Sequence, residues 1–172
     1  MMRHPTGEDE TAGEAFWRFS LALYARPGVA DALIALQDRA GGDVNLILYA
    51  LWLGATQGMR LDPAGLATAR AATAPLNAAI VMPLRRLRRR LKTEADGDLQ
   101  ALRRRVAGLE IATERRVQFR LAASLRETTH AMPEDDRRAA AHANLALALG
   151  GEAGAPEAGV LRRALASLTR RD

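Results

Sequence analysis

The stretch DVNLILYALWL, residues 43–53, is the most apolar part of the chain and decides its fold. Asp43 is of a residue type that caps the N-terminus of helices, and Gly58 is of the type that ends them. A helix that is apolar on every side normally lies at the centre of its domain. We therefore expect residues 44–57 to form the central helix of this protein.

Helix signals continue toward the N-terminus. Thr11 and Glu14 form a Thr-x-x-Glu capping box, in which each side chain bonds to the free backbone N–H of the other residue. The helix behind them ends near Pro27, and a second helix follows and stops at Gly42. The first three helices contain six of the seven aromatic residues, so we expect the main core within residues 11–57.

Residues 62–128 are expected to form a long antiparallel hairpin of two helices. An Asp62-Pro63 pair starts the first arm, which Pro75 and Pro83 interrupt or kink. A polar turn at residues 93–97 leads into the second arm.

The fold class is all-α: a single-domain bundle of six or seven helices that includes this long basic hairpin. We place the helical domain at residues 11–128 and a C-terminal helical tail at residues 129–172. The tail contains two shorter helices. Because residues 150–159, which join them, are rich in glycine and alanine, we expect the tail to be loosely packed.

Composition excludes several classes of protein. The chain has 172 residues, a net charge of +5 and no cysteine, so disulfides, thiolate metal sites and cysteine nucleophiles are absent. Residues 1–10 lack the apolar segment of a secretory signal. The longest apolar stretch, residues 46–55, is about half as long as a membrane helix. We therefore expect a cytoplasmic protein with no transmembrane segment.

Positive charge gathers in the hairpin. Residues 85–120 contain twelve basic and five acidic side chains, a local net charge of +7. Leu84, Leu87 and Leu91 share one stripe of the first arm, which places Arg85 and its neighbours on the opposite, solvated face. The turn should bring arginines of both arms together in one dense patch. The candidate residues for binding an anion or a partner are Arg85, Arg86, Arg89, Arg90, Arg103, Arg104 and Arg105.

Three interpretations of this patch remain open: a solvated helix face, a site for an acidic protein partner, and a site for nucleic acid or an anionic membrane. Guanidinium groups bind phosphates in bidentate fashion, and the release of counterions favours that contact. No aromatic residue lies among the arginines, so nucleic-acid bases have no stacking platform. Among the binding functions we favour an acidic protein partner, and we leave self-association open.

A second candidate site lies at the central helix. Asp43 and Asn45 stand at its start, where they cap the helix or form the polar mouth of a pocket for a small apolar ligand. The aromatic side chains around them would line this pocket or simply form core. The candidate pocket residues are Trp17, Tyr24, Asp43, Asn45, Tyr49 and Trp52.

Glu110 and Glu114, four residues apart on the second arm, are candidates for acid–base or metal chemistry. A structural role is favoured, in which they pair with Arg70 or Arg88, because no histidine accompanies them at metal-ligand spacing. The sequence also lacks a phosphate-binding loop, a dinucleotide-binding glycine set and a serine nucleophile elbow. We expect no metal and no cofactor, and we favour a non-enzymatic protein while leaving catalysis open.

Several segments resemble one protein family. The strongest are residues 16–29, FWRFSLALYARPGV, and residues 42–53, and weaker ones are residues 81–89 and 109–115. Together they resemble an uncharacterised proteobacterial family of about 160 residues, an ordinary size for one domain. The resemblance extends over residues 14–120 and leaves the tail out. It implies a small cytoplasmic bacterial protein and brings no activity, cofactor or site residue.

The leading hypothesis is a non-enzymatic helical interaction protein, or adaptor, whose arginine-rich hairpin binds an acidic partner. One alternative is sequence-independent binding of nucleic acid through the same arginines. Another is a pocket for a small apolar ligand, or an unrecognised enzyme, at the central helix. The charge of residues 85–120 and the lack of a catalytic constellation in the sequence favour the first hypothesis.

Overall fold

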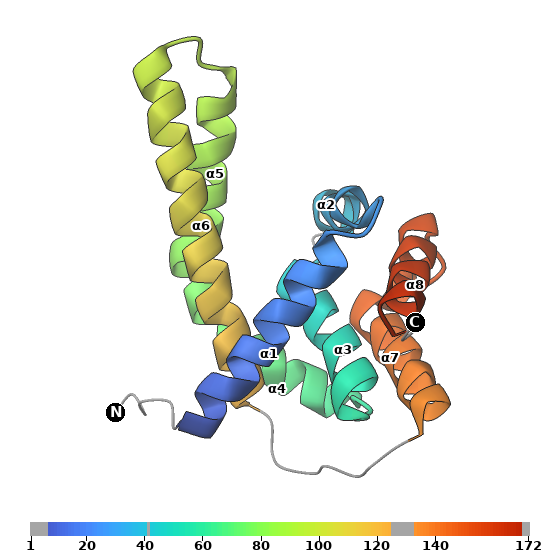
Figure 1. Cartoon of the computed structure of the whole chain (residues 1–172). Coiled ribbons are helices and arrows are strands. Elements are labelled where there is room, and N and C mark those ends of the chain that lie inside the picture. Colours follow the sequence, from blue (N-terminus) through green and yellow to red (C-terminus); the bar gives the residue numbers. More distant parts are fainter. Residues whose placement is uncertain (1–6, 41, 125–132, 170–172) are drawn as a thin grey trace.

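The computed structural model describes residues 7–40, 42–124 and 133–169, which are all-α and contain no strand. The α4 helix, a π-helical segment and α5 follow one another without a break and form one bent rod, so these residues contain seven helical rods, as predicted. Figure 1 shows α5 and α6 as a hairpin that projects from a body formed by the other helices. The elements are α1 (Gly7–Tyr24), α2 (Val29–Ala40), α3 (Val44–Gln57), α4 (Pro63–Leu76), the π-helical segment (Asn77–Val81), α5 (Met82–Arg90), α6 (Gly97–Ala123), α7 (Glu134–Leu149) and α8 (Pro156–Thr169).

The central position predicted for α3 is confirmed. Asp43 caps the helix, because its Oδ1 atom accepts hydrogen bonds from the backbone N–H groups of Asn45 (3.0 Å) and Leu46 (3.3 Å). Every residue from Val44 to Gly54 is buried. The ring of Trp52 stacks on that of Phe16 from α1, with 4.9 Å between the ring centroids. The most apolar stretch of the sequence therefore forms the centre of the core.

The tail differs from the loosely packed segment that the sequence led us to expect. Its helix α7 lies against α3 at such close range that a Cβ atom on Gly54 would sit 2.2 Å from the Cα atom of Ala141. The Asn144 side chain donates a hydrogen bond to the Met59 carbonyl (2.8 Å) and accepts one from the Leu61 N–H (2.8 Å). Small residues were interpreted as weak packing, whereas here they allow two helices to approach closely.

The last helix is also fixed to the body. Its residues Leu161 and Leu165 are fully buried. Arg39 at the end of α2 makes ion pairs with Glu152 (2.7 Å) and Glu157 (3.0 Å), and the hydrogen bond from Arg39 lowers the pKa of the Glu157 carboxyl. Charged groups thus reinforce the apolar contact between α2 and α8.

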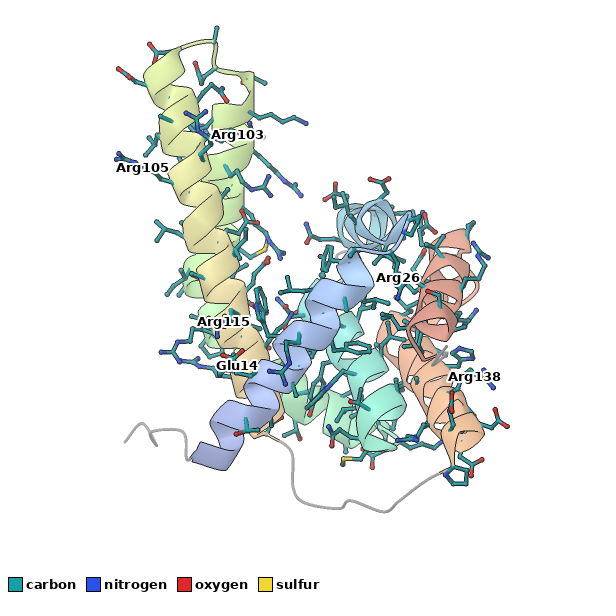
Figure 2. All side chains as sticks on the ribbon, in the orientation of Figure 1. Glu14, Arg26, Arg103, Arg105, Arg115 and Arg138 are labelled. Carbon is teal, nitrogen blue, oxygen red and sulfur yellow. The ribbon has the colours of Figure 1, made fainter. Side chains whose placement is uncertain are left out.

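The predicted N-terminal capping box is wrong. The α1 helix begins at Gly7, so Thr11 and Glu14 lie inside it. Glu14 instead forms an ion pair with Arg115 of α6. The guanidinium of Arg115 lies over the ring of Phe119, 5.3 Å from its centroid. The Glu14–Arg115 pair therefore joins α1 to α6, as Figure 2 illustrates.

The first arm of the hairpin is bent between the two prolines that were expected to interrupt it. In the π-helical segment the N–H of Met82 bonds to the carbonyl of Asn77, five residues back. Pro83 has no N–H, and in an α-helix its ring would clash with the carbonyl four residues earlier. The wider π-helical turn relieves that clash, and in Figure 1 α4 crosses the base of the molecule while α5 rises beside α6.

Membrane-spanning length was also assessed within the described ranges. No single helix there is both long enough and apolar enough to cross a membrane. Residues 11–24 and 29–39 meet both limits only when taken together, and they are bent by 101° relative to each other.

Candidate functional site

The two arms of the hairpin are joined by a cluster of four charged side chains, which we call the hairpin ion cluster: Arg85, Arg88, Glu110 and Glu114. The Nε atom of Arg88 lies 2.5 Å from Oε2 of Glu110, and the Nε atom of Arg85 lies 3.3 Å from Oε1 of the same residue. Arg85 also contacts Glu114. The structural role predicted for the two glutamates is thus observed, with Arg88 as expected and with Arg85 in place of Arg70.

The position of Arg85 corrects the expectation that it lies on a solvated face. Its side chain is only 14% exposed and points toward α6, whereas Leu87 of the expected leucine stripe is 42% exposed. The sequence pattern favoured packing through leucines. The hairpin is instead closed by Val81, Arg85 and Arg88, because two glutamates on the opposing helix neutralise the arginines. This pairing across the turn rotates α5 relative to our expectation.

Burial changes the acid–base properties of the groups around the cluster. Burial raises the pKa of Glu114, and the hydrogen bond from Arg85 opposes this change. The hydrogen bond to Glu110 raises the pKa of Arg88. Tyr24 of α1 lies close enough to respond as well, and burial together with the negative charge of Glu114 raises its pKa to about 12. The phenol of Tyr24 therefore belongs to the surroundings of this cluster.

Both tyrosines of the chain should titrate late. Burial raises the pKa of Tyr49 too, and Tyr24 and Tyr49 are the two tyrosines in the sequence. We expect absorbance at 295 nm to change well above pH 10 in the folded protein and near pH 10 in denaturant, the ordinary value for tyrosine. Since the folded state holds these protons more tightly, the free energy of unfolding should fall as pH rises above about 10. A folded-state midpoint near pH 10 would contradict this prediction, and Tyr24→Phe isolates the signal of Tyr49.

The seven candidate arginines do not form one patch. Arg85 belongs to the hairpin ion cluster, and Arg89 pairs with Asp38 of α2 at 2.6 Å. Figure 2 shows Arg105 pointing away from the body and Arg103 lying nearer the other arm. Among residues that the structure describes, some candidates have no ion-pair partner. These are Arg86, Arg90, Arg103, Arg104 and Arg105.

Apolar side chains are exposed on the side of the hairpin that faces away from the body. Leu87 is two residues from Arg89, which contacts α2, and at about 100° per residue it lies on the opposite side of α5. Leu109 is nine residues, or about two and a half turns, from Gln118, which contacts α1. Leu109 is 58% exposed. We define the outer hairpin face as Leu87, Leu102 and Leu109 with the flanking Arg90, Arg105 and Arg116.

The six candidate pocket residues do not line one pocket. Trp52 and Tyr49 pack with Phe16 in the core, and their ring centroids are 6.2 Å apart. Tyr24 lies at the hairpin ion cluster, and Trp17 is half-buried. Asp43 and Asn45 instead line a cleft between α2 and α5. The aromatic part of the predicted site is therefore core, and the polar part faces a different hollow.

This α2–α5 cleft has a volume of about 310 Å³. Hydrogen bonds fix the residues behind it: Ser20 donates to Gln118 (3.0 Å), and the Gln118 amide donates to Asn45 Oδ1 (3.0 Å). The Asn77 amide donates to Asp43 Oδ2 at 2.8 Å. Sequence reasoning missed Gln118 and Asn77, because these partners are far apart in the chain and single amides carry no signal. The wall of the cleft is thus held in one arrangement.

Fold and surfaces together define an all-α protein with one central apolar helix, a projecting hairpin closed by ion pairs, and a polar cleft at the base of that hairpin. Residues 15–121 match the family model described as Protein of unknown function (DUF2390), and the chain belongs to this family. The match confirms the resemblance to an uncharacterised family. No curated protein and no solved structure matches the chain. The matched residues extend from α1 through most of α6 and end before α7.

Proposed function

We propose that the protein is a non-enzymatic, cytoplasmic interaction protein whose outer hairpin face binds an acidic amphipathic helix of a partner protein. The observation that carries this proposal is a row of exposed leucines flanked by arginines that have no acidic partner in the described part of the chain. Exposed apolar residues gathered on one side of a soluble protein often mark an interaction site. The projecting hairpin leaves this side accessible.

Charge and spacing favour the chosen partner. Leu102 and Leu109 are seven residues apart, which is about 10.5 Å along a helix, and an amphipathic helix presents its own anchors with the same repeat. Arg90 and Arg105 lie beside these leucines and would face the acidic edges of the bound helix. Complementary charge mainly accelerates association and excludes wrong partners. A second copy of this chain would bring arginine against arginine, which disfavours self-association.

The test compares two charge-reversal variants in a native affinity purification that is split into nuclease-treated and untreated halves. We expect one stoichiometric protein partner that survives nuclease. Arg90→Glu with Arg105→Glu should weaken its recovery about tenfold or more, equivalent to about 1.4 kcal/mol of binding free energy. Leu87→Gln with Leu109→Gln should act in the same direction.

The matched control is Arg60→Glu with Arg163→Glu, which changes the net charge equally at two exposed positions outside the hairpin. This control should retain the partner. Retention of the partner by the Arg90/Arg105 variant, or equal loss from the control, would contradict the proposal. The original choice of Arg85, Arg86 and Arg89 for charge reversal is unsuitable, because two of these residues already make internal ion pairs.

Nucleic-acid binding is the competing outcome of the same experiment, and the net charge of +7 over residues 85–120 is what favours it. It would be identified by recovered nucleic acid and by loss of the co-purified proteins after nuclease. Binding would then weaken with salt, with a log–log slope of about 0.9 per phosphate neutralised on duplex DNA. A flat salt response would exclude this function.

A further inference from the structure

We propose that the α2–α5 cleft binds a small organic anion, whose charged group is held by Arg86 and Arg89. The cleft is separate from the outer hairpin face. Its volume of about 310 Å³ lies within the range of small-molecule sites. Val81 and Met82 give it an apolar wall, while amides and charged groups line the rest.

The arginines that line the cleft differ in availability. Arg85 is committed to Glu110 and Glu114 and cannot turn toward a ligand without breaking the hairpin ion cluster. Arg86 is exposed and has no ion-pair partner among the described residues, and Arg89 lies three residues further along the same helix. Side chains three residues apart on a helix are neighbours, so two guanidinium groups can hold one anionic group.

Asp38 already occupies part of this position. Its carboxylate lies 2.6 Å from Arg89, and both side chains are more than half exposed. This is the geometry that a carboxylate or phosphate of a ligand would adopt toward the same guanidinium. Asp38 therefore acts as a competing anion supplied by the protein, and an exposed pair of this kind is weak enough to be displaced.

The far end of the cleft is suited to a hydrogen-bond donor on the ligand. Asp43 accepts bonds from two backbone N–H groups at the start of α3 and one from Asn77, so its negative charge is stabilised in place. A carboxylate oxygen can accept more than one hydrogen bond, and a hydroxyl or amino group of a ligand would satisfy it. The expected ligand is thus an anion that also carries a hydroxyl or amino group.

The test measures binding of three probes to the full chain by isothermal titration calorimetry at low salt: inorganic phosphate, glycerol 3-phosphate and 2-hydroxybutyrate. The organic probes distinguish a phosphate from a carboxylate ligand, and inorganic phosphate tests whether the apolar wall contributes. We expect saturable one-to-one binding of at least one organic probe. Arg86→Ala should weaken it about tenfold, the usual cost of losing a hydrogen bond to a charged group.

Asp38→Asn should change the affinity in the opposite direction. Removal of the competing carboxylate frees Arg89, so the organic probe should bind about threefold more tightly, in line with the strength of exposed ion pairs. Arg90→Ala is the matched control, because Arg90 is exposed on the same helix but lies outside the cleft. It should leave the affinity unchanged.

Three results would overturn the proposal: no binding of either organic probe, equal weakening by Arg86→Ala and Arg90→Ala, or no gain from Asp38→Asn. The variants also separate this site from the outer hairpin face. Arg90 matters for the partner helix and not for the anion, whereas Arg86 matters for the anion and not for the partner helix. Either site can therefore fail without the other.

Discussion

Replacement of Trp52 by alanine is expected to lower the free energy of unfolding by about 3–5 kcal/mol, the usual range for removing a large buried aromatic side chain. Trp52 is 1% exposed and stacks on Phe16, which is itself fully buried. The ring also lies near Tyr49. The substitution would leave a cavity at the junction of α1 and α3, and the tightly packed α7 limits how far α3 can move to fill it.

Denaturant unfolding followed by circular dichroism provides the measurement. Trp17→Ala is the matched control, because Trp17 belongs to the same aromatic group of the sequence but is only half-buried. The control should cost clearly less. A loss below about 1 kcal/mol for Trp52→Ala, well short of the range for buried aromatic residues, would mean that α3 is not the centre of the core.

Two glycines, both inside helices, should respond to alanine with opposite signs. On Gly54 a Cβ atom would lie 2.2 Å from backbone atoms of Ala141, and backbone cannot rotate away as a side chain can. Overpacking of a core typically costs about 1–3 kcal/mol, and this contact should reach the upper end or exceed it. We therefore expect Gly54→Ala to separate α3 from α7 and to destabilise the protein strongly.

Gly108→Ala is the matched control for this prediction. Nothing lies within 4 Å of a Cβ atom on Gly108, which is exposed in the middle of α6. Here alanine should raise the free energy of unfolding by about 0.5–1 kcal/mol, because glycine is the poorer helix former. The difference between the two variants separates the close contact from helix propensity. If Gly54→Ala were also stabilising, the close packing of α7 on α3 would be disproved.

Much of the fold could be predicted because the strongest signals are local. The cap at Asp43, the stop at Gly58 and the apolar run between them act within one helix, and each is present in the structure. The start of α4 at Asp62-Pro63 depends on the same kind of signal. Such features follow from the preferences of neighbouring residues, so a single sequence contains them.

The candidate site was less predictable because it depends on residues far apart in the chain. Arg85 was assigned to solvent since nothing near it in sequence neutralises its charge, and Glu110 and Glu114 do so only across the turn. The Asn77–Asp43 bond likewise joins two elements that no local pattern relates. The close contact of Ala141 with Gly54 could not be distinguished from a loose tail by composition, because small residues are compatible with both.

The π-helical segment gives the hairpin an unusual dependence on chain length. Between Asn77 and Val81 the backbone holds one more residue per hydrogen-bonded turn than an α-helix. Loss of a single residue there would restore the α-helical pattern and turn everything that follows by about 100°. Arg85 and Arg88 would swing away from their glutamates, and Leu87 would take a new direction. Which surface the hairpin presents is thus encoded by the number of residues at its base as much as by their identity.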